Sequence, residues 1–209
     1  MFMSRVRVFA ALLAASAVTP ALAQETQPAA EVEVSTVDGA VAFAKSLTAN
    51  ATSVLTDENK SEAEKLENFR QVLADGMALD IIGKFMIGDT RKSMSDEQTT
   101  RYDAIFPQYI TKLYAEQFQE IVGKPLEVVE AKELGARDVI VRTKFDRKEG
   151  SPIMVDWRVR KLRSGDRKAI DIIVSGVSIM LVKREEFSSF VSTNGVDALL
   201  DRLESEASA

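Results

Sequence analysis

The sequence predicts an α+β domain in which a twisted four-stranded antiparallel meander has one face covered by about six helices. Apolar residues recur at helical spacing in the first half of the chain and again near its end. Between these regions the apolar period changes to two, as in strands that bury one face. This segregation of helices from strands is typical of α+β folds, and there are enough helices to cover one face of the sheet but not both.

Six helices are expected from the apolar spacing, in residues 41–55, 66–77, 79–87, 95–123, 178–192 and 194–204. Ser95 with Gln98 three residues later is a capping-box sequence that begins the fourth helix, and Pro107 should kink that helix. The third helix is apolar nearly all round, so it should be buried, and Gly88 should end it.

Four strands are expected in residues 126–134, 139–145, 153–159 and 169–175, joined by turns that contain glycine. Along the last three strands, one face carries the residues Val139, Val141, Thr143, Phe145, Ile153, Val155, Trp157, Val159, Ile170, Ile172 and Val174. Periodicity does not distinguish a filled core beneath this face from a lined cavity. The close packing of protein interiors favours the filled core.

The opposite face of the predicted sheet carries Arg142, Lys144, Arg158 and Arg160, and the hairpin after the third strand adds more basic residues. This basic patch has two interpretations. It is either a solvated outer face that discourages edge pairing, or a docking surface for acidic partners or anionic lipid headgroups. The first is favoured, because alternating Lys and Arg also occur on ordinary exposed strands.

The composition suits one globular domain, with 45% hydrophobic and 28% charged residues in a chain of 209. The chain contains no His and no Cys, which excludes a His-based triad, a thiol nucleophile, a zinc finger, disulfides and an iron–sulfur cluster. Its net charge of -5 argues against a nucleic-acid partner, because proteins that bind nucleic acids need a positive field to displace counterions from the phosphates.

The N-terminal region has the order of a secretory signal peptide. Arg5 and Arg7 precede an apolar run, Val8–Val18, which is followed by a small-x-small sequence ending at Ala23. We therefore expect residues 1–23 to be cleaved after Ala23; an uncleaved helix is the alternative. The run is too short to cross a bilayer, so a soluble exported protein is expected.

Residues 24–36 are rich in Ala, Glu and Pro without apolar periodicity, which predicts a flexible leader. Residues 205–209 are small and polar and predict a disordered tail. Between them the sequence has no internal repeat, so residues 37–204 are expected to form a single domain.

The turn from the last predicted strand into the next helix reads Val-Ser-Gly-Val-Ser-Ile at residues 174–179, and Arg184 and Phe187 follow. This order resembles the MlaC family of periplasmic phospholipid-binding proteins, also called the toluene-tolerance family. The resemblance extends back through Ile82–Gly88, Tyr109, Leu113 and Tyr114. It covers residues 37–203.

The resemblance implies a soluble periplasmic carrier that maintains outer-membrane lipid asymmetry. Such a carrier shuttles phospholipid between an outer-membrane lipoprotein–porin complex and an inner-membrane ABC transporter complex with its substrate-binding component. The implied ligand is a phospholipid in an apolar cavity between sheet and helices, with no cofactor, no metal and a monomeric chain. The residues expected to line this cavity are Met86, Tyr109, Leu113, Val141, Phe145, Val155, Trp157, Val159, Ile172 and Val174.

Two departures from the family pattern concern the shape of the pocket. Residues 168–171 read Lys-Ala-Ile-Asp and keep only the Asp of the Trp, aliphatic, Tyr-Asp order that many members carry. Trp157 stands where Tyr is frequent. A hopanoid-associated lipid carrier is therefore the alternative within the family.

Two further alternatives belong to other functional classes. An enzyme could use Asp156 and Asp171 as a carboxylate pair across neighbouring strands. We expect no enzyme, because both side chains fall on the solvent face and no G-x-S-x-G sequence is present. Ser178 should instead cap the helix that follows it. The other alternative is a periplasmic adaptor with a closed core and no ligand.

Overall fold

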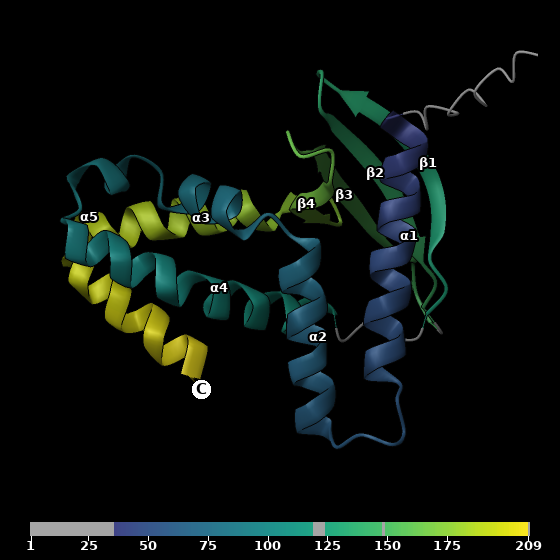
Figure 1. Cartoon of the computed structure of the whole chain (residues 1–209), viewed down its shortest axis with the longest axis horizontal. Coiled ribbons are helices and arrows are strands. Elements are labelled where there is room, and N and C mark those ends of the chain that lie inside the picture. Colours follow the sequence, from purple (N-terminus) through teal and green to yellow (C-terminus); the bar gives the residue numbers. More distant parts are fainter. Residues whose placement is uncertain (1–35, 119–123, 148, 209) are drawn as a thin grey trace, which may run out of the picture. The chain divides into compact units, whose positions relative to one another are not determined.

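The computed structural model describes residues 36–118, 124–147 and 149–208, and it confirms the α+β class (Figure 1). Its helices are α1 (Thr36–Leu55), α2 (Glu62–Gly76), α3 (Leu79–Ile87), the 3-10 helix η1 (Gly88–Ser93), α4 (Asp96–Phe118) and α5 (Ile179–Ser208). Its strands are β1 (Glu127–Leu134), β2 (Asp138–Phe145), β3 (Ile153–Lys161), β4 (Arg167–Val174) and β5 (Val177–Ser178). The strands form one antiparallel sheet in the order β1-β2-β3-β4-β5.

The element count differs from the prediction in two places. The sheet has a fifth strand because Ser175 and Gly176, with φ angles of 50° and 85°, turn the chain back so that β5 pairs with the end of β4. A strand of two residues is too short to show a period. Within the described ranges there are five α-helices instead of six, because the last two predicted helices form α5, whose helical dihedrals are broken at Gly195.

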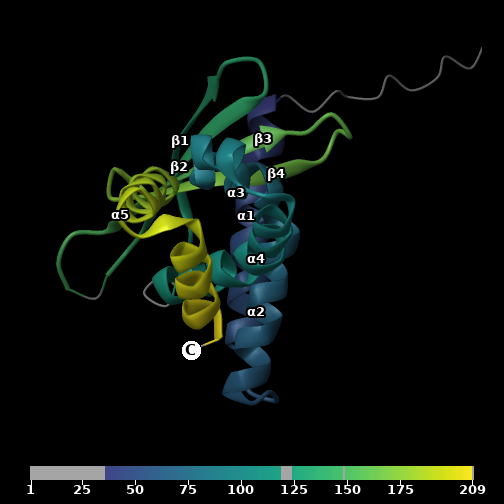
Figure 2. The same ribbon diagram turned by 90° about the vertical axis from the view of Figure 1, so that its left-hand side faces the viewer.

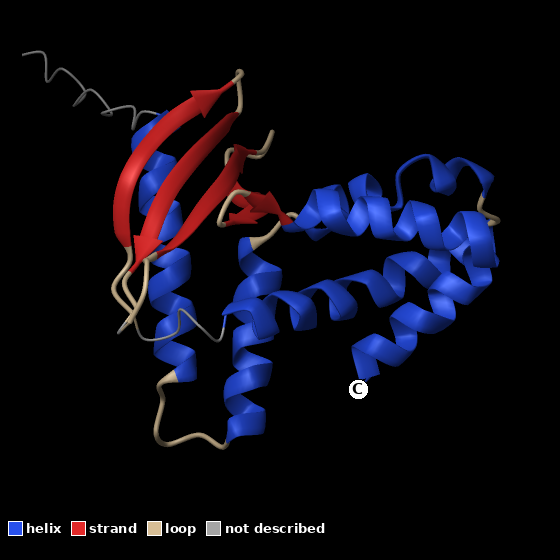
Figure 3. Cartoon of the chain, turned by 180° about the vertical axis from the view of Figure 1, so that it is seen from behind, coloured by secondary structure: helices blue, strands red, loops and turns tan. Residues whose placement is uncertain are grey.

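One face of the sheet is covered by α1, which contacts β1, β2, β3 and β4 (Figure 3). The side chains that α1 buries recur every three or four residues and are small, as at Ala40, Ala44 and Ala51. α2 packs beside α1, and a side chain at Gly76 would overlap that of Leu47. Figure 3 looks onto the opposite face of β1, β2 and β3, where no described helix lies.

Side-chain caps set the starts of α4 and α2. Ser95 N donates to Gln98 Oε1 at 3.0 Å and Gln98 N donates to Ser95 Oγ at 3.1 Å, which confirms the predicted capping box. A second capping box joins Ser61 and Glu64, so α2 begins four residues before the predicted helix. Pro107 lies inside α4, as predicted.

The strand register brings the apolar residues of three strands side by side. Val141, Trp157 and Ile172 are directly opposite one another on β2, β3 and β4. The register between β3 and β4 shifts at Arg158/Val159, so Ala169 lies opposite Val159. Ala169 therefore takes the inner position that the sequence pattern assigned to Ile170. Such a β-bulge, in which one strand has an extra residue relative to its partner, cannot be detected in the alternation of a single strand's sequence.

The remaining helices pack against one another and against the edge of β4. Ala78, between α2 and α3, donates its backbone N–H to Ala169 O at 2.9 Å and so covers the edge of β4. α4 contacts α2, α3 and α5 (Figure 2). Tyr102 on α4 donates its hydroxyl to Gly83 O on α3 at 2.9 Å, and Arg101 binds Asp201 and Glu204 on α5.

α5 continues to Ser208, beyond the point at which the sequence predicts a disordered tail. Arg202 Nε lies 2.6 Å from Glu206 Oε1, and Lys112 Nζ donates to Glu206 O at 2.7 Å, so the last turn is tied to α4. The predicted signal peptide and all of the predicted leader except Thr36 lie outside the described residues. None of the described helices combines the length and apolarity needed to cross a membrane.

Candidate functional site

The ten residues predicted to line a lipid cavity come together in one hydrophobic cluster. Eight of them are buried members of the cluster, and Leu113 and Val174 are half-buried against it. By element they are Met86 on α3, Tyr109 and Leu113 on α4, Val141 and Phe145 on β2, Val155, Trp157 and Val159 on β3, and Ile172 and Val174 on β4. The prediction that these residues lie together is therefore confirmed by the hydrophobic cluster. Their binding of lipid stays a prediction.

Trp157 is the largest fully buried side chain of this cluster, with 1% of its surface exposed. Its indole N–H donates to Thr143 Oγ1 at 3.0 Å, and Thr143 donates in turn to Val155 O at 2.8 Å. The only polar atom of the indole is thus satisfied by the neighbouring strand, which holds the ring against the inner face. The alternation of the sequence places Thr143 on this face but gives no sign that it accepts the indole hydrogen.

Three surface hollows stand out among the described residues. The α1–β1 hollow, about 450 Å³, is lined by Lys45, Thr48, Ala49, Thr52, Ser53, Lys124, Pro125 and Leu126. The α2–α4 hollow, about 300 Å³, is lined by Glu67, Arg70, Gln71, Ala74, Pro107, Gln108, Thr111 and Ala207. The α4–α5 hollow, about 170 Å³, is lined by Tyr109, Lys112, Leu113, Glu116 and Glu206. Of the ten predicted lining residues, Tyr109 and Leu113 border the third hollow and the other eight border none of the three.

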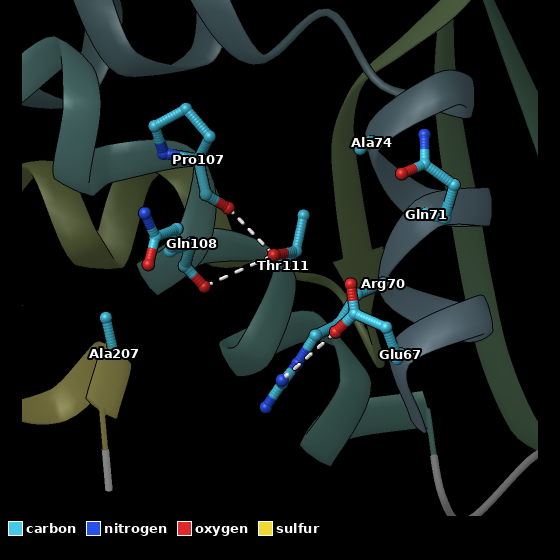
Figure 4. Close-up of a pocket in the computed structure, with 8 residues that line it drawn as sticks. All are labelled: Glu67, Arg70, Gln71, Ala74, Pro107, Gln108, Thr111 and Ala207. Carbon is cyan, nitrogen blue, oxygen red and sulfur yellow. Dashed lines mark hydrogen bonds and ion pairs between the residues drawn. The ribbon is translucent and has the colours of Figure 1, made fainter. Parts of the chain in front are cut away.

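Figure 4 shows that the α2–α4 hollow has mixed walls, with five polar side chains beside Ala74, Pro107 and Ala207. Two of them bond within their own helices: Thr111 Oγ1 donates to Pro107 O at 2.8 Å, and Gln71 donates to Asp75 at 3.0 Å. Arg70 Nε is buried without a hydrogen-bond partner among the described residues. Arg70 lies 3.6 Å from Glu67, beyond hydrogen-bond distance, so this ion pair is weak.

Tyr109 lies between α4 and α5, where its ring centroid is 5.9 Å from that of Phe187. Lys183 Nζ lies 6.0 Å from the centre of the Tyr109 ring. Burial raises the pKa of the Tyr109 hydroxyl above its ordinary value. Phe187, one of the residues that carry the family resemblance, thus packs against a predicted lining residue.

Tyr114 is fully buried, and its hydroxyl has no hydrogen-bond partner among the residues that the structure describes. Burial raises its pKa strongly. An unsatisfied buried hydroxyl costs about 1–3 kcal/mol.

We therefore expect Tyr114→Phe to raise the free energy of unfolding by about 1 kcal/mol in urea titrations of lipid-stripped protein. A loss of stability instead would show that the hydroxyl has a partner in solution.

The four basic residues of the outer face are paired with carboxylates. Asp138, with only 5% of its side chain exposed, accepts from Arg158 and Arg160 at 2.6–2.9 Å. Arg142 binds Asp156 at 2.8 Å and Lys144 binds Glu127 at 3.0 Å. Each of the four cations thus has a carboxylate on an adjacent strand, and strand pairing sets these partners. This pairing argues against the docking surface, which was the less favoured of the two interpretations.

The carboxylate pair that the enzyme alternative needed is not formed. Asp156 is held by Arg142, whereas Asp171 accepts from Ser178 Oγ at 2.6 Å and from the backbone N–H of Met180 at 3.4 Å. Burial is the largest cause of the raised pKa of Asp171, which is 4% exposed instead of solvated. Ser178 Oγ also accepts from the backbone N–H of Leu181, as expected of a cap.

Comparisons with known proteins match this fold. A structure of the phospholipid-binding protein from Ralstonia solanacearum, in complex with a phospholipid, superposes with a TM-score of 0.67 at 18% identity. The match covers 80% of this chain and 96% of that one. The chain is 25% identical over 158 residues to the intermembrane phospholipid transport system binding protein MlaC of Haemophilus influenzae, which spans 72% of this chain and 74% of that protein.

The family comparison covers most of the fold described above. The model of the MlaC protein family matches residues 45–205. This segment begins within α1, includes all five strands and ends within α5. The match thus includes the sheet, the helices over its inner face and the turn that carries Asp171 and Ser178. This chain therefore belongs to the MlaC protein family.

Proposed function

We propose that this protein is a periplasmic carrier that binds a phospholipid and shuttles it between outer-membrane and inner-membrane transport complexes. The observation that carries the proposal is the family match, which extends over the whole sheet and from within α1 to within α5. Two findings support it: the Haemophilus influenzae relative is named as a binding protein of intermembrane phospholipid transport, and the Ralstonia solanacearum protein was crystallised with a phospholipid.

The physical chemistry of acyl chains suits such a carrier. A phospholipid with about 30 methylene groups gains roughly 20 kcal/mol or more when they leave water, at about 0.8 kcal/mol each. A bilayer shelters the same groups equally well, so transfer between bilayer and protein is nearly neutral. Small differences in packing or partner contacts can then set the direction. The apolar cluster under α1 supplies the required kind of surface.

The proposal assigns the acyl chains to the space between α1, α4 and the inner face of the sheet, beside the ten predicted lining residues. For most of these residues burial is complete, so a charged substitution would test folding instead of binding. Val174, which is half-buried at the border of the cluster, tolerates a larger side chain better. It therefore offers a cleaner test than Trp157 or Val155.

We expect purified mature protein to yield about one phospholipid per chain by organic extraction and mass spectrometry. In Val174→Trp the added bulk should occupy acyl-chain space and lower this ratio at least several-fold. Ile173→Trp is the matched control, because Ile173 is adjacent, is also half-buried and faces the opposite side of the sheet.

The outcomes separate the proposed carrier from its competitors. Absence of lipid in the wild type, before and after incubation with phospholipid vesicles, would favour the adaptor with a closed core. A hopanoid in the extract would identify the alternative ligand class. Equal lipid content in the two tryptophan variants would remove Val174 from the lining while leaving the carrier role intact.

A further inference from the structure

The α1–β1 hollow is the largest of the three and lies on the flank of α1. Its α1 residues fall at intervals of three and four, on one face of the helix: Lys45, Thr48, Ala49, Thr52 and Ser53. Four of these five side chains are small, so space remains between α1 and the start of β1. The other wall consists of Lys124, Pro125 and Leu126.

The walls of the hollow suit the uncharged part of an amphiphile. Ala49, Pro125 and Leu126 contribute apolar atoms, and the hydroxyl of Thr48 is already used because it donates to Ala44 O at 3.0 Å. The volume of about 450 Å³ falls within the range of small-molecule sites, about 300–1,000 Å³.

The charges of the hollow suit an anion. Lys45 and Lys124 stand on its two walls, and neither ammonium has a hydrogen bond or ion pair with any residue that the structure describes. Lys144 on β2 differs, because it is bound to Glu127 at 3.0 Å. On a chain of net charge -5, two unpaired cations at one largely apolar hollow form a distinct local site for a negative group.

We propose that the α1–β1 hollow holds the phosphate headgroup of the bound lipid, with Lys45 and Lys124 each donating to a phosphate oxygen. The glycerol region would then lie against Ala49 and Leu126. Charge-assisted hydrogen bonds to phosphate are about twice as strong as neutral ones. This inference rests on the proposed carrier function and adds to it a contact with the anionic part of the ligand.

The test measures the binding of dihexanoyl phosphatidylglycerol, a short-chain soluble phospholipid, to lipid-stripped mature protein by isothermal titration calorimetry. We expect Lys45→Gln/Lys124→Gln to weaken binding about tenfold through the loss of two charge-assisted contacts. Lys45→Arg/Lys124→Arg should restore most of the affinity. For the wild type, affinity should fall as salt is raised, whereas the glutamine variant should lose most of this dependence.

The matched control is Lys60→Gln/Lys132→Gln, which removes the same charge from exposed positions outside the hollow. If both double variants weaken binding equally, general charge is responsible and the headgroup site is refuted. Unchanged affinity in the Lys45/Lys124 variant also refutes it, while the carrier function stands because lipid still binds. If the wild type binds no phospholipid at all, the carrier function itself fails. Saturable binding of inorganic phosphate, with lipid affinity unaffected by the variants, would reassign the hollow to free phosphate.

A second variant tests the space of the hollow without changing its charge. Ala49 is exposed on α1, so Ala49→Phe should fold and should fill the hollow. We expect it to weaken binding of the short-chain lipid several-fold. Asn50→Phe, at the next exposed position of α1 and outside the hollow, should bind like the wild type. Equal affinity of the two phenylalanine variants would contradict the assignment.

Discussion

Trp157→Ala is expected to lower the free energy of unfolding by about 3–5 kcal/mol, the range measured when large buried aromatic side chains are truncated. Trp157 is 1% exposed and sits among Val141 and Ile172 in the strand register, so its removal leaves a void that strands cannot close. Urea titration of lipid-stripped mature protein measures this loss without the stabilisation that a bound ligand adds.

Trp157→Phe is the matched variant for this experiment. It keeps most of the ring packing and removes the N–H that donates to Thr143, so a loss of about 1 kcal/mol is expected. If Trp157→Ala instead costs less than about 1 kcal/mol, the indole borders an open cavity in solution and is not enclosed by core atoms. The loss in Trp157→Ala thus measures how closely core atoms enclose the indole in the lipid-free protein, and the loss in Trp157→Phe measures its hydrogen bond to Thr143.

Asp138→Asn should be the most damaging change on the outer face of the sheet. The substitution leaves Arg158 and Arg160 without their shared carboxylate. Removing one member of a buried ion pair costs about 3–5 kcal/mol, and partial exposure of both arginines reduces the expected loss here to roughly 2 kcal/mol at pH 7. Asp156→Asn provides the comparison, because its partner Arg142 is more exposed and the loss should be smaller.

The cost of Asp138→Asn should depend on pH in a defined direction. Burial by itself would raise the pKa of Asp138, but hydrogen bonds from Arg160 and Arg158 outweigh it and leave the pKa below its ordinary value. A carboxyl whose pKa is lowered by folding adds stability above its unfolded pKa of about 3.9 and loses it as pH falls through the folded value. Urea midpoints of wild type and variant should therefore converge below about pH 4. A constant difference across this range would show that the lost stability is not electrostatic.

Much of the inner face of the sheet followed from alternation alone. Val141, Trp157 and Ile172 were assigned to one apolar face, and strand pairing places them side by side. The capping box at Ser95 was also predictable, because its two partners are three residues apart. Both are local signals, carried by residues whose spacing along the chain sets their spacing in space.

The ion pairs of the outer face could not be predicted from the sequence. Lysines and arginines alternate there in the sequence, which indicates a basic patch but not its carboxylate partners. Asp138 pairs with Arg158 and Arg160, which are 20 and 22 residues away, so the neutralising partner could not be found without the strand register. An acidic residue at the start of a strand, opposite alternating arginines, is the signal that would have indicated it.

Local pattern was sufficient for the apolar face and the capped helix at Ser95, because each depends on residues close together in the chain. The order of the elements and motifs along the whole sequence was sufficient for the α+β class and the family resemblance. Contacts between distant segments decided the rest: the bulge that brings Ala169 inward, the carboxylates that occupy the outer-face cations, and the hollow between α1 and β1. Register, burial and pairing of charges depend on how elements pack, and packing is a property of the folded chain as a whole.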